Sequence, residues 1–412
     1  MRNVQFIAAL LAVVIVSCDR DEDPTPKGLV TYTLEVDQQW SIFANGPDGR
    51  LLDSKQLVFG QPVTLSVANP PDSFSLTLVR VFQTNPPVLD ITTYTGIKPG
   101  SSFTPKMYTP AEFTPVQESG KAKVNITKYP IHQSLPLVVG DPYQYQLYYS
   151  DGQATVPFSL SVWETEAPPY LATGYNGDFL HPVYKYIDPV NVGATATADF
   201  TTFAPFPKTL DLEPFDTPVT AQVQFDMYSL TASNYVAYKF ADVGWTYSGI
   251  SPTIRVGYLD QVSNYYIDMT VYEYEESTQK VLKQLSFTNM GPMPSTIEFP
   301  DDDFTLRDES KEAFDFEFDG TYQVKSQSYS LENGDSRVQW SVFSGVGDSM
   351  PVADMPPELL SQFPGLDLQG VPYVSTTFYY YPDGYSYGDF RSDRFTTTFA
   401  PEHPGYAQTF MK

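Results

Sequence analysis

The chain has 412 residues, with 24 Lys and Arg against 49 Asp and Glu, which gives a formal net charge of −25 at pH 7. A surface this negative repels phosphate backbones and anionic headgroups, so nucleic acid is excluded as an expected partner. Hydrophobic residues make up 42% of the chain, which is enough for a core, and the 30 Tyr and 28 Phe favour strands.

Residues 1–17 are predicted to be a signal peptide that ends just before Cys18, the single cysteine of the chain. Arg2 gives a positive start, and the apolar run from Phe6 to Val16 is far shorter than the ~20 residues that span a bilayer. Residues 18–27 follow as a charged, proline-interrupted linker. Because such a linker cannot bury apolar surface, we expect it to stay extended.

The residues Ile15, Val16 and Ser17 before Cys18 resemble the lipobox of bacterial lipoproteins. The resemblance implies that Cys18 carries fatty acyl chains such as palmitate, and several chains on one cysteine anchor a protein stably to a membrane. The acidic run after Cys18 is similar to the surface-export signal of Bacteroidetes-type lipoproteins, which implies attachment to the outer membrane, facing the cell exterior. Two alternatives stay open: inner-membrane retention, which enterobacterial sorting associates with Asp19, and an ordinary secretory signal.

Beyond the linker, apolar and polar residues alternate with a period of two between turn dipeptides, which predicts an all-β fold. We expect tandem antiparallel β-sandwich modules, Ig-like or fibronectin-like in architecture. The predicted parts are a first module at 28–118, a second at 119–215, and a C-terminal β region at 216–412, which is either one large sheet domain or two sandwiches. One short helix is expected from Pro357 to Phe363.

The second module holds the sharpest local prediction, a β-hairpin with Asp151-Gly152 as its loop. The register set by this loop pairs an apolar face on both strands and leaves the other face polar. The apolar face would carry Tyr143, Tyr145, Leu147 and Tyr149 against Ala154, Val156, Phe158 and Leu160, and the polar face Gln144, Gln146 and Tyr148 against Thr155, Pro157 and Ser159.

The C-terminal stretch TTFYYYPDGYSYGDF is the best candidate for a binding surface. With Asp383-Gly384 as a hairpin loop, one face carries Phe378, Tyr380, Tyr385 and Tyr387. A row of tyrosine rings can stack on the C–H face of a sugar or anchor a protein partner. The alternative is that this face is core, as aromatic strand faces usually are.

An acidic segment is the candidate metal site. Its carboxylates, from Asp301, Asp302, Asp303 and Asp308, could together coordinate Ca²⁺. A solvated acidic loop is the alternative, and no other cofactor is expected.

No catalytic motif stands out: the sequence has no G-x-S-x-G, no phosphate loop and no H-E-x-x-H. We therefore expect a non-enzymatic binding or accessory protein that engages a glycan or a surface protein through aromatic strand faces. A structural or adhesion component that self-associates is one alternative. A polysaccharide hydrolase that uses a carboxylate pair is another.

Overall fold

The computed structural model describes residues 27–34, 40–103, 117–130, 136–149, 153–164, 168–213, 219–230, 236–311, 313–333, 336–348, 353–363, 366–381, 384–396 and 405–412. The predicted signal peptide, Cys18 and nearly all of the acidic linker lie outside these ranges, as do both residues of the Asp151-Gly152 loop. Within the described ranges, no helix is long and apolar enough to cross a membrane.

Strands make up nearly all of the regular structure, which confirms the all-β prediction. The chain divides into two compact units. The first unit combines Met1–Pro105 with Ser330–Pro372, and the second combines Lys106–Tyr329 with Tyr373–Lys412.

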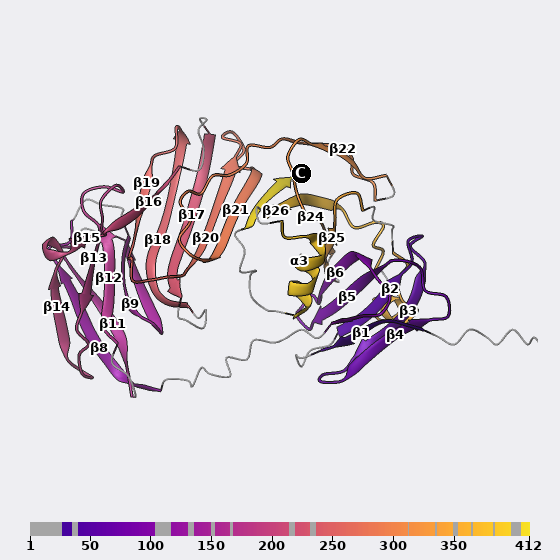
Figure 1. The fold of residues 1–412 in the computed structure, drawn as a ribbon, viewed down its shortest axis with the longest axis horizontal. Coiled ribbons are helices and arrows are strands. Elements are labelled where there is room, and N and C mark those ends of the chain that lie inside the picture. Colours follow the sequence, from indigo (N-terminus) through magenta and orange to yellow (C-terminus); the bar gives the residue numbers. More distant parts are fainter. Residues whose placement is uncertain are drawn as a thin grey trace, which may run out of the picture. The chain divides into compact units, whose positions relative to one another are not determined.

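The first unit contains two sheets, with strand orders β4-β1-β7 and β25-β6-β5-β2-β3 (Figure 1). Its elements are β1 (Lys27–Thr33), β2 (Trp40–Asn45), β3 (Leu51–Leu57), β4 (Pro62–Val67), β5 (Phe74–Phe82), β6 (Val88–Ile97), β7 (Ser101–Phe103), β25 (Ser336–Ser344) and α2 (Pro357–Gln362). The helix α2 confirms the predicted short helix. Trp340 of β25 is buried, and its Nε1 donates to Thr93 Oγ1 of β6 at 3.0 Å, which holds this late strand parallel to β6.

The second unit begins with a β-sandwich, as the sequence predicts for this region. One sheet has the order β11-β8-β14 and the other β10-β9-β12-β13-β15. The elements are β8 (Glu118–Thr127), β9 (Pro136–Asp141), β10 (Gln144–Tyr149), β11 (Thr155–Trp163), β12 (Tyr170–Tyr175), β13 (Pro182–Ile187), β14 (Thr195–Asp199), the 3₁₀ turn η1 (Phe200–Thr202) and β15 (Ala204–Pro205). Buried apolar side chains from both sheets form one core between them, Val124 and Phe158 from one and Val139 and Ala172 from the other.

The predicted backbone pairing of β10 with β11 is wrong. Strand β10 pairs only with β9, and β11 pairs with β8, so the two strands are edges of different sheets. The alternation of β11 is as predicted, with Val156, Phe158 and Leu160 buried, whereas that of β10 is reversed. Tyr145 and Tyr149 are exposed, and Tyr148 packs toward the sandwich core.

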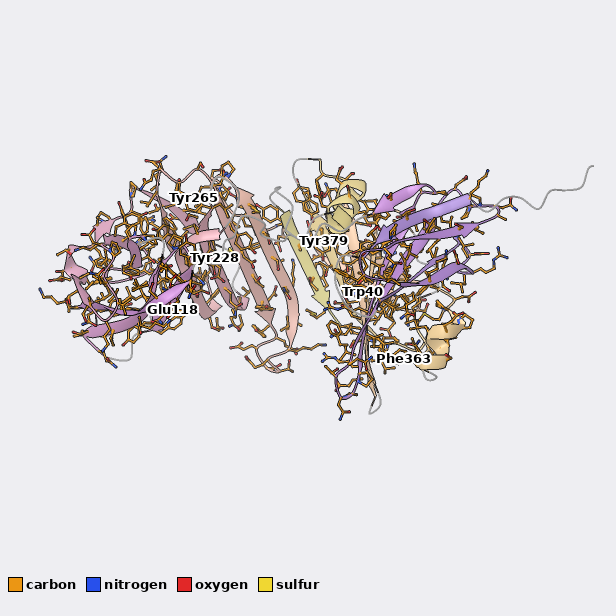
Figure 2. All side chains as sticks on the ribbon, turned by 90° about the horizontal axis from the view of Figure 1, so that it is seen from below. Trp40, Glu118, Tyr228, Tyr265, Phe363 and Tyr379 are labelled. Carbon is orange, nitrogen blue, oxygen red and sulfur yellow. The ribbon has the colours of Figure 1, made fainter. Side chains whose placement is uncertain are left out.

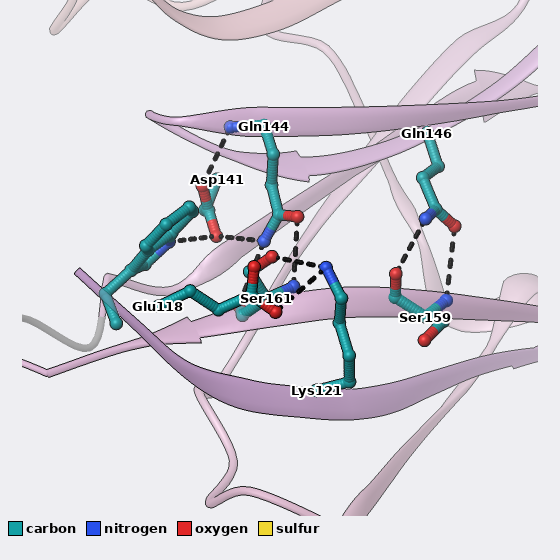
Figure 3. Close-up of polar contacts among 8 residues, drawn as sticks. Glu118, Lys121, Asp141, Gln144, Gln146, Ser159 and Ser161 are labelled. Atoms are coloured by element: carbon teal, nitrogen blue, oxygen red, sulfur yellow. Dashed lines mark hydrogen bonds and ion pairs between the residues drawn. The ribbon is translucent and has the colours of Figure 1, made fainter. Parts of the chain in front are cut away.

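Glutamine side chains replace the missing ladder between β10 and β11 (Figure 3). The Gln146 carboxamide donates to Ser159 O at 2.6 Å and accepts from Ser159 N at 3.1 Å. Gln144 does the same with Ser161, donating at 2.9 Å and accepting at 2.9 Å. Each carboxamide thus satisfies one backbone donor and one backbone acceptor of β11, as a neighbouring strand would.

The rest of the second unit is built on one large antiparallel sheet, in which β17, β18, β20 and β21 lie side by side (Figure 1). In this unit the sheet order is β18-β17-β20-β21-β27-β26-β24. The strands are β17 (Val219–Leu230), β18 (Val236–Gly249), β20 (Tyr265–Tyr274), β21 (Val281–Gly291), β24 (Val324–Asn333), β26 (Tyr373–Tyr380) and β27 (Gly405–Met411).

One face of this sheet is core, and it includes Ile267, Met269 and Val271 of β20. The paired strands β16 (Lys208–Leu212) and β19 (Ile254–Tyr258) supply Leu210 and Val256 to the same core. The hairpin of β22 (Phe304–Asp308) and β23 (Asp315–Phe318) contributes an aromatic cluster at the β26 and β27 end, where the Phe318 ring stacks on Phe378 at 4.0 Å.

The predicted aromatic hairpin after β26 is wrong, because Tyr387 begins a helix, α3 (Tyr387–Thr396). Phe378 is only 2% exposed, and Tyr385 is also buried, with its hydroxyl donating to Asp393 of α3. Phe390 of α3 packs on Tyr379 of β26, with ring centroids 5.8 Å apart. The aromatic side chains of this C-terminal stretch therefore pack mainly against one another and against the sheet.

Candidate binding surface

The face of the large sheet opposite the core is polar. Cross-strand register on β18, β17, β20 and β21 arranges its side chains in four rows. In that strand order the rows are Thr246, Gln222, Tyr272 and Gln284; then Gly244, Gln224, Thr270 and Ser286; then Asp242, Asp226, Asp268 and Thr288; and finally Lys239, Tyr228, Tyr266 and Met290. Carboxamides, hydroxyls, carboxylates and tyrosine rings thus share one sheet face.

A β-bulge in β18 turns Lys239 onto this face. Register shifts between Met227 and Tyr228 of β17, so that Met227 pairs with Ala241 and Tyr228 pairs with Lys239. Phe240 is the extra residue, and both Phe240 and Ala241 point into the core. A bulge redirects a side chain in this way because one strand contributes two residues opposite one.

Lys239 is held between two carboxylates. Its Nζ lies 2.6 Å from Asp226 Oδ1 and 2.5 Å from Asp242 Oδ2, although its side chain is only 2% exposed. Burial alone would lower the pKa of Lys239, but hydrogen bonds with Asp226, Asp242 and Tyr228 outweigh burial and raise it. The ammonium group therefore stays charged and neutralises part of the acidic row.

Tyrosines cover the ammonium group of Lys239. The Tyr145 ring centroid lies 4.1 Å from Lys239 Nζ and that of Tyr228 4.9 Å away, both within the range of a cation–π interaction. The two rings meet edge to face at 6.1 Å (Tyr228 is labelled in Figure 2). Tyr145 comes from β10, so the reversed alternation of that strand is what brings its ring to the large sheet.

An open depression of about 380 Å³ lies beside this cluster on β17 and β18. Its polar lining is Tyr149, Gln222, Gln224, Asp226, Asp242 and Thr246. Gly244 contributes the floor where a side chain is missing, since an added Cβ would meet only Val223 O, at 3.8 Å. Tyr149 forms one wall, 47% exposed, and burial and then Asp242 raise the pKa of its hydroxyl.

The acidic row carries excess negative charge. Asp242, Asp226 and Asp268 stand directly opposite one another on three adjacent strands, and one lysine contacts only the first two. The pKa of Asp226 is raised by burial, against the lowering effect of Lys239. Burial and then the charge of Asp226 raise the pKa of Asp268. Such a surface disfavours anionic ligands.

The residues predicted from sequence lie elsewhere. Tyr380 and Tyr387 are partly exposed, outside the rows above, and ligand binding by them stays a prediction. Phe378 and Tyr385 are buried, which removes them from any ligand on the surface.

The acidic segment at 301–308 is used in local structure. Asp302 Oδ2 accepts from Gln408 Nε2 at 2.8 Å, and Asp308 Oδ1 accepts from Ser310 N at 2.8 Å, a bond that lowers the pKa of Asp308. Asp303 N donates to Asp319 Oδ1 at 2.7 Å, and Asp301 is exposed. Over the described ranges, no three His, Cys, Asp or Glu side chains are grouped to hold a metal ion, so calcium binding stays a prediction.

Sequence reasoning missed the cluster around Lys239. The alternation Gln222, Gln224, Asp226, Tyr228 in β17 was a visible signal for a polar strand face. The bulge in β18 and the approach of β10 are tertiary features, and neither leaves a period-two signal.

Comparisons with known proteins add little. No described protein family matches the sequence, and no curated protein matches it. Among solved structures, the chain is similar to a protein from Bacteroides uniformis described as a candidate carbohydrate binding protein, with 12% identity and a TM-score of 0.14. The similarity covers 39% of this chain and 93% of that one. A likeness this distant carries no argument about ligand or activity.

Proposed function

We propose that the protein binds a neutral carbohydrate on the polar face of β17, β18 and β20. The observation that carries this proposal is the depression lined by Gln222, Gln224, Asp226 and Asp242, with the exposed ring of Tyr149 as its wall. Carboxamides and carboxylates hydrogen-bond to sugar hydroxyls, and a tyrosine ring packs on the apolar C–H face of a sugar.

Electrostatics favour a neutral ligand. The net charge of −25 and the row of three carboxylates oppose sulfated or uronic acid glycans, as they oppose nucleic acid. A neutral sugar is not repelled by this negative potential, and its hydroxyl groups can donate hydrogen bonds to the carboxylates.

Binding is favoured over hydrolysis at this surface. Glycoside hydrolysis needs one carboxyl group free to deliver a proton and a second to act on the sugar. Lys239 contacts both Asp226 and Asp242, which commits these two carboxylates to a buried cation and leaves Asp268 without a second uncommitted carboxylate in the row. Their role is therefore to hold the surface and accept hydrogen bonds.

The test is a glycan array of neutral and acidic polysaccharides, followed by titration calorimetry on each that binds. The double variant Tyr145→Ala with Tyr149→Ala should lose affinity by about tenfold or more, because each aromatic contact contributes about 1 kcal/mol. Tyr186→Ala is the matched control, since Tyr186 of β13 is 39% exposed but lines neither the depression nor the cluster. An array with no neutral glycan bound would refute the proposal.

We also propose that the protein works at the bacterial cell surface, held in the outer membrane by acyl chains on Cys18. The lipobox-like residues before Cys18 and the charged, proline-interrupted sequence of the linker support this location. A surface location gives a glycan-binding face access to polysaccharide outside the cell.

A further inference from the structure

On β17 and β20 the polar face has aromatic residues at both ends and none between them. Tyr228 and Tyr266 oppose each other at one end, and Tyr272 stands between Gln222 and Gln284 at the other. The pairing of β17 with β20 has no register shift from Ala221 to Ser229, so all of these side chains share one face. The six-residue step from Tyr266 to Tyr272 spans roughly 20 Å at about 3.3 Å per residue.

The middle of the face offers only hydrogen-bonding groups on β17 and β20. Between the aromatic ends stand Gln224 opposite Thr270 and Asp226 opposite Asp268. The depression lies beside these groups on β17 and β18 and runs in the same direction, because its lining extends along β17 from residue 222 to 226 and along β18 from 242 to 246. The surface is therefore elongated parallel to the strands.

The end at Tyr272 is held in place by its neighbours. The Tyr274 hydroxyl donates to Gln222 Oε1 at 3.1 Å, which fixes the orientation of that carboxamide. The rings of Tyr272 and Tyr274 lie 6.5 Å apart on the same strand face. A ring beside an oriented carboxamide is a place for a sugar, about 20 Å along the strands from the end at Tyr228 and Tyr266.

We infer that the ligand is a linear neutral oligosaccharide lying along β17 and β20, with sugar rings stacked at both aromatic ends. The inference rests on the proposed function and extends it from carbohydrate in general to an unbranched chain of several units. A mono- or disaccharide is too short to reach from Tyr266 to Tyr272. The hydroxyls of the middle units would face Gln224, Asp226 and Thr270.

The experiment is a length series by titration calorimetry, using cello-, malto-, laminari- and xylo-oligosaccharides from the disaccharide to the octasaccharide. Affinity should rise by about tenfold or more with length and then level off once both aromatic ends are occupied. Tyr272→Ala should abolish that gain, so that the long members bind no more tightly than the disaccharide. Tyr272→Phe, which keeps the ring, should behave as the wild type.

The outcomes separate the two proposals. If the disaccharide binds as tightly as the octasaccharide while Tyr145→Ala with Tyr149→Ala abolishes binding, carbohydrate binding stands and the linear track is refuted. Equal losses for short and long members in Tyr272→Ala would also refute the track, because they indicate a structural role for Tyr272. If none of these oligosaccharides and no neutral glycan of the array binds, both proposals fall.

Discussion

The carboxamide of Gln146 and the backbone of Ser159 form a pair of hydrogen bonds, with Nε2 donating to the carbonyl at 2.6 Å and Oε1 accepting from the N–H at 3.1 Å. This contact turns the even-numbered glutamines of β10 toward β11. Because side chains alternate along a strand, Tyr145 and Tyr149 must then point the other way, toward the large sheet. The candidate surface therefore depends on a contact made on the opposite side of β10.

The hydrogen bonds of Gln146 should make a measurable contribution to the free energy of unfolding. Gln146→Ala removes both hydrogen bonds to Ser159 and should lower the free energy of unfolding by about 1 kcal/mol, since water can replace the lost partner at this exposed site. Gln146→Glu should cost at least as much, because a carboxylate repels the Ser159 carbonyl. Urea denaturation measures both variants, and a Glu variant as stable as the wild type would contradict the described geometry.

Lys239 should be essential to the stability of the fold around Asp226 and Asp242. Lys239→Met removes a buried cation and leaves Asp226 opposite Asp242, so we expect a loss of about 3 kcal/mol in the free energy of unfolding. Adding Asp226→Asn and Asp242→Asn to this variant should restore much of that loss, because no uncompensated charge then remains. Thermal unfolding of the single and triple variants tests this. A single variant with unchanged stability would show that the cation is not what holds these strands.

Asp268→Asn should stabilise the protein at neutral pH. Burial and then the charge of Asp226 raise the folded-state pKa of Asp268 above 3.8, so the folded state binds this proton more tightly than the unfolded state. Stability contributed by protonated Asp268 is therefore lost as pH rises through the folded pKa, and at neutral pH the carboxylate destabilises the fold. The Asn variant should be more stable by up to about 1 kcal/mol at pH 7.

The stability difference between Asp268→Asn and the wild type should shrink as the pH falls through the raised folded-state pKa of Asp268 toward 3.8, because folded wild-type protein takes up this proton at a pH above 3.8. Unfolding curves at several pH values between 4 and 8 measure it. A difference that stays constant across this range would contradict the assigned cause.

Cys18 should carry the anchor. In cells fed a clickable palmitate analogue, the wild-type protein should be labelled and fractionate with membranes. Cys18→Ser should abolish both labelling and membrane association, because serine lacks the thiol group on which the proposed lipid anchor depends. Protease treatment of intact cells then distinguishes outward from inward display. A wild-type protein that is not labelled would contradict the proposed acylation of Cys18.

Alternation along single strands predicted much of the fold. The face of β11 with Val156, Phe158 and Leu160 is buried as expected, because period-two patterning reports burial directly. The pairing of strands was harder, since a strong Asp-Gly turn signal did not make β10 and β11 neighbours in one sheet. Gln144 and Gln146 could bridge two sheets only once both sheets were in place.

The candidate site was beyond the reach of local patterns for the same reason. Lys239 reaches the open face only through a bulge that places Phe240 and Ala241 together in the core. The tyrosine-rich C-terminal stretch looked like a binding hairpin, but packing against Phe318 and Asp393 made Phe378 and Tyr385 part of the interior. Composition identified tyrosine as the important residue type, and tertiary packing decided which tyrosines remain outside.

The most direct measurement is the affinity of wild-type protein and of Gly244→Phe for a neutral glycan that the array identifies. A Cβ at this position meets no atom closer than 3.8 Å, so the variant should fold normally while its ring fills the depression. We predict a loss of affinity of about tenfold or more with an unchanged melting temperature. Unaltered affinity in a folded Gly244→Phe variant would contradict binding on this face of β17, β18 and β20.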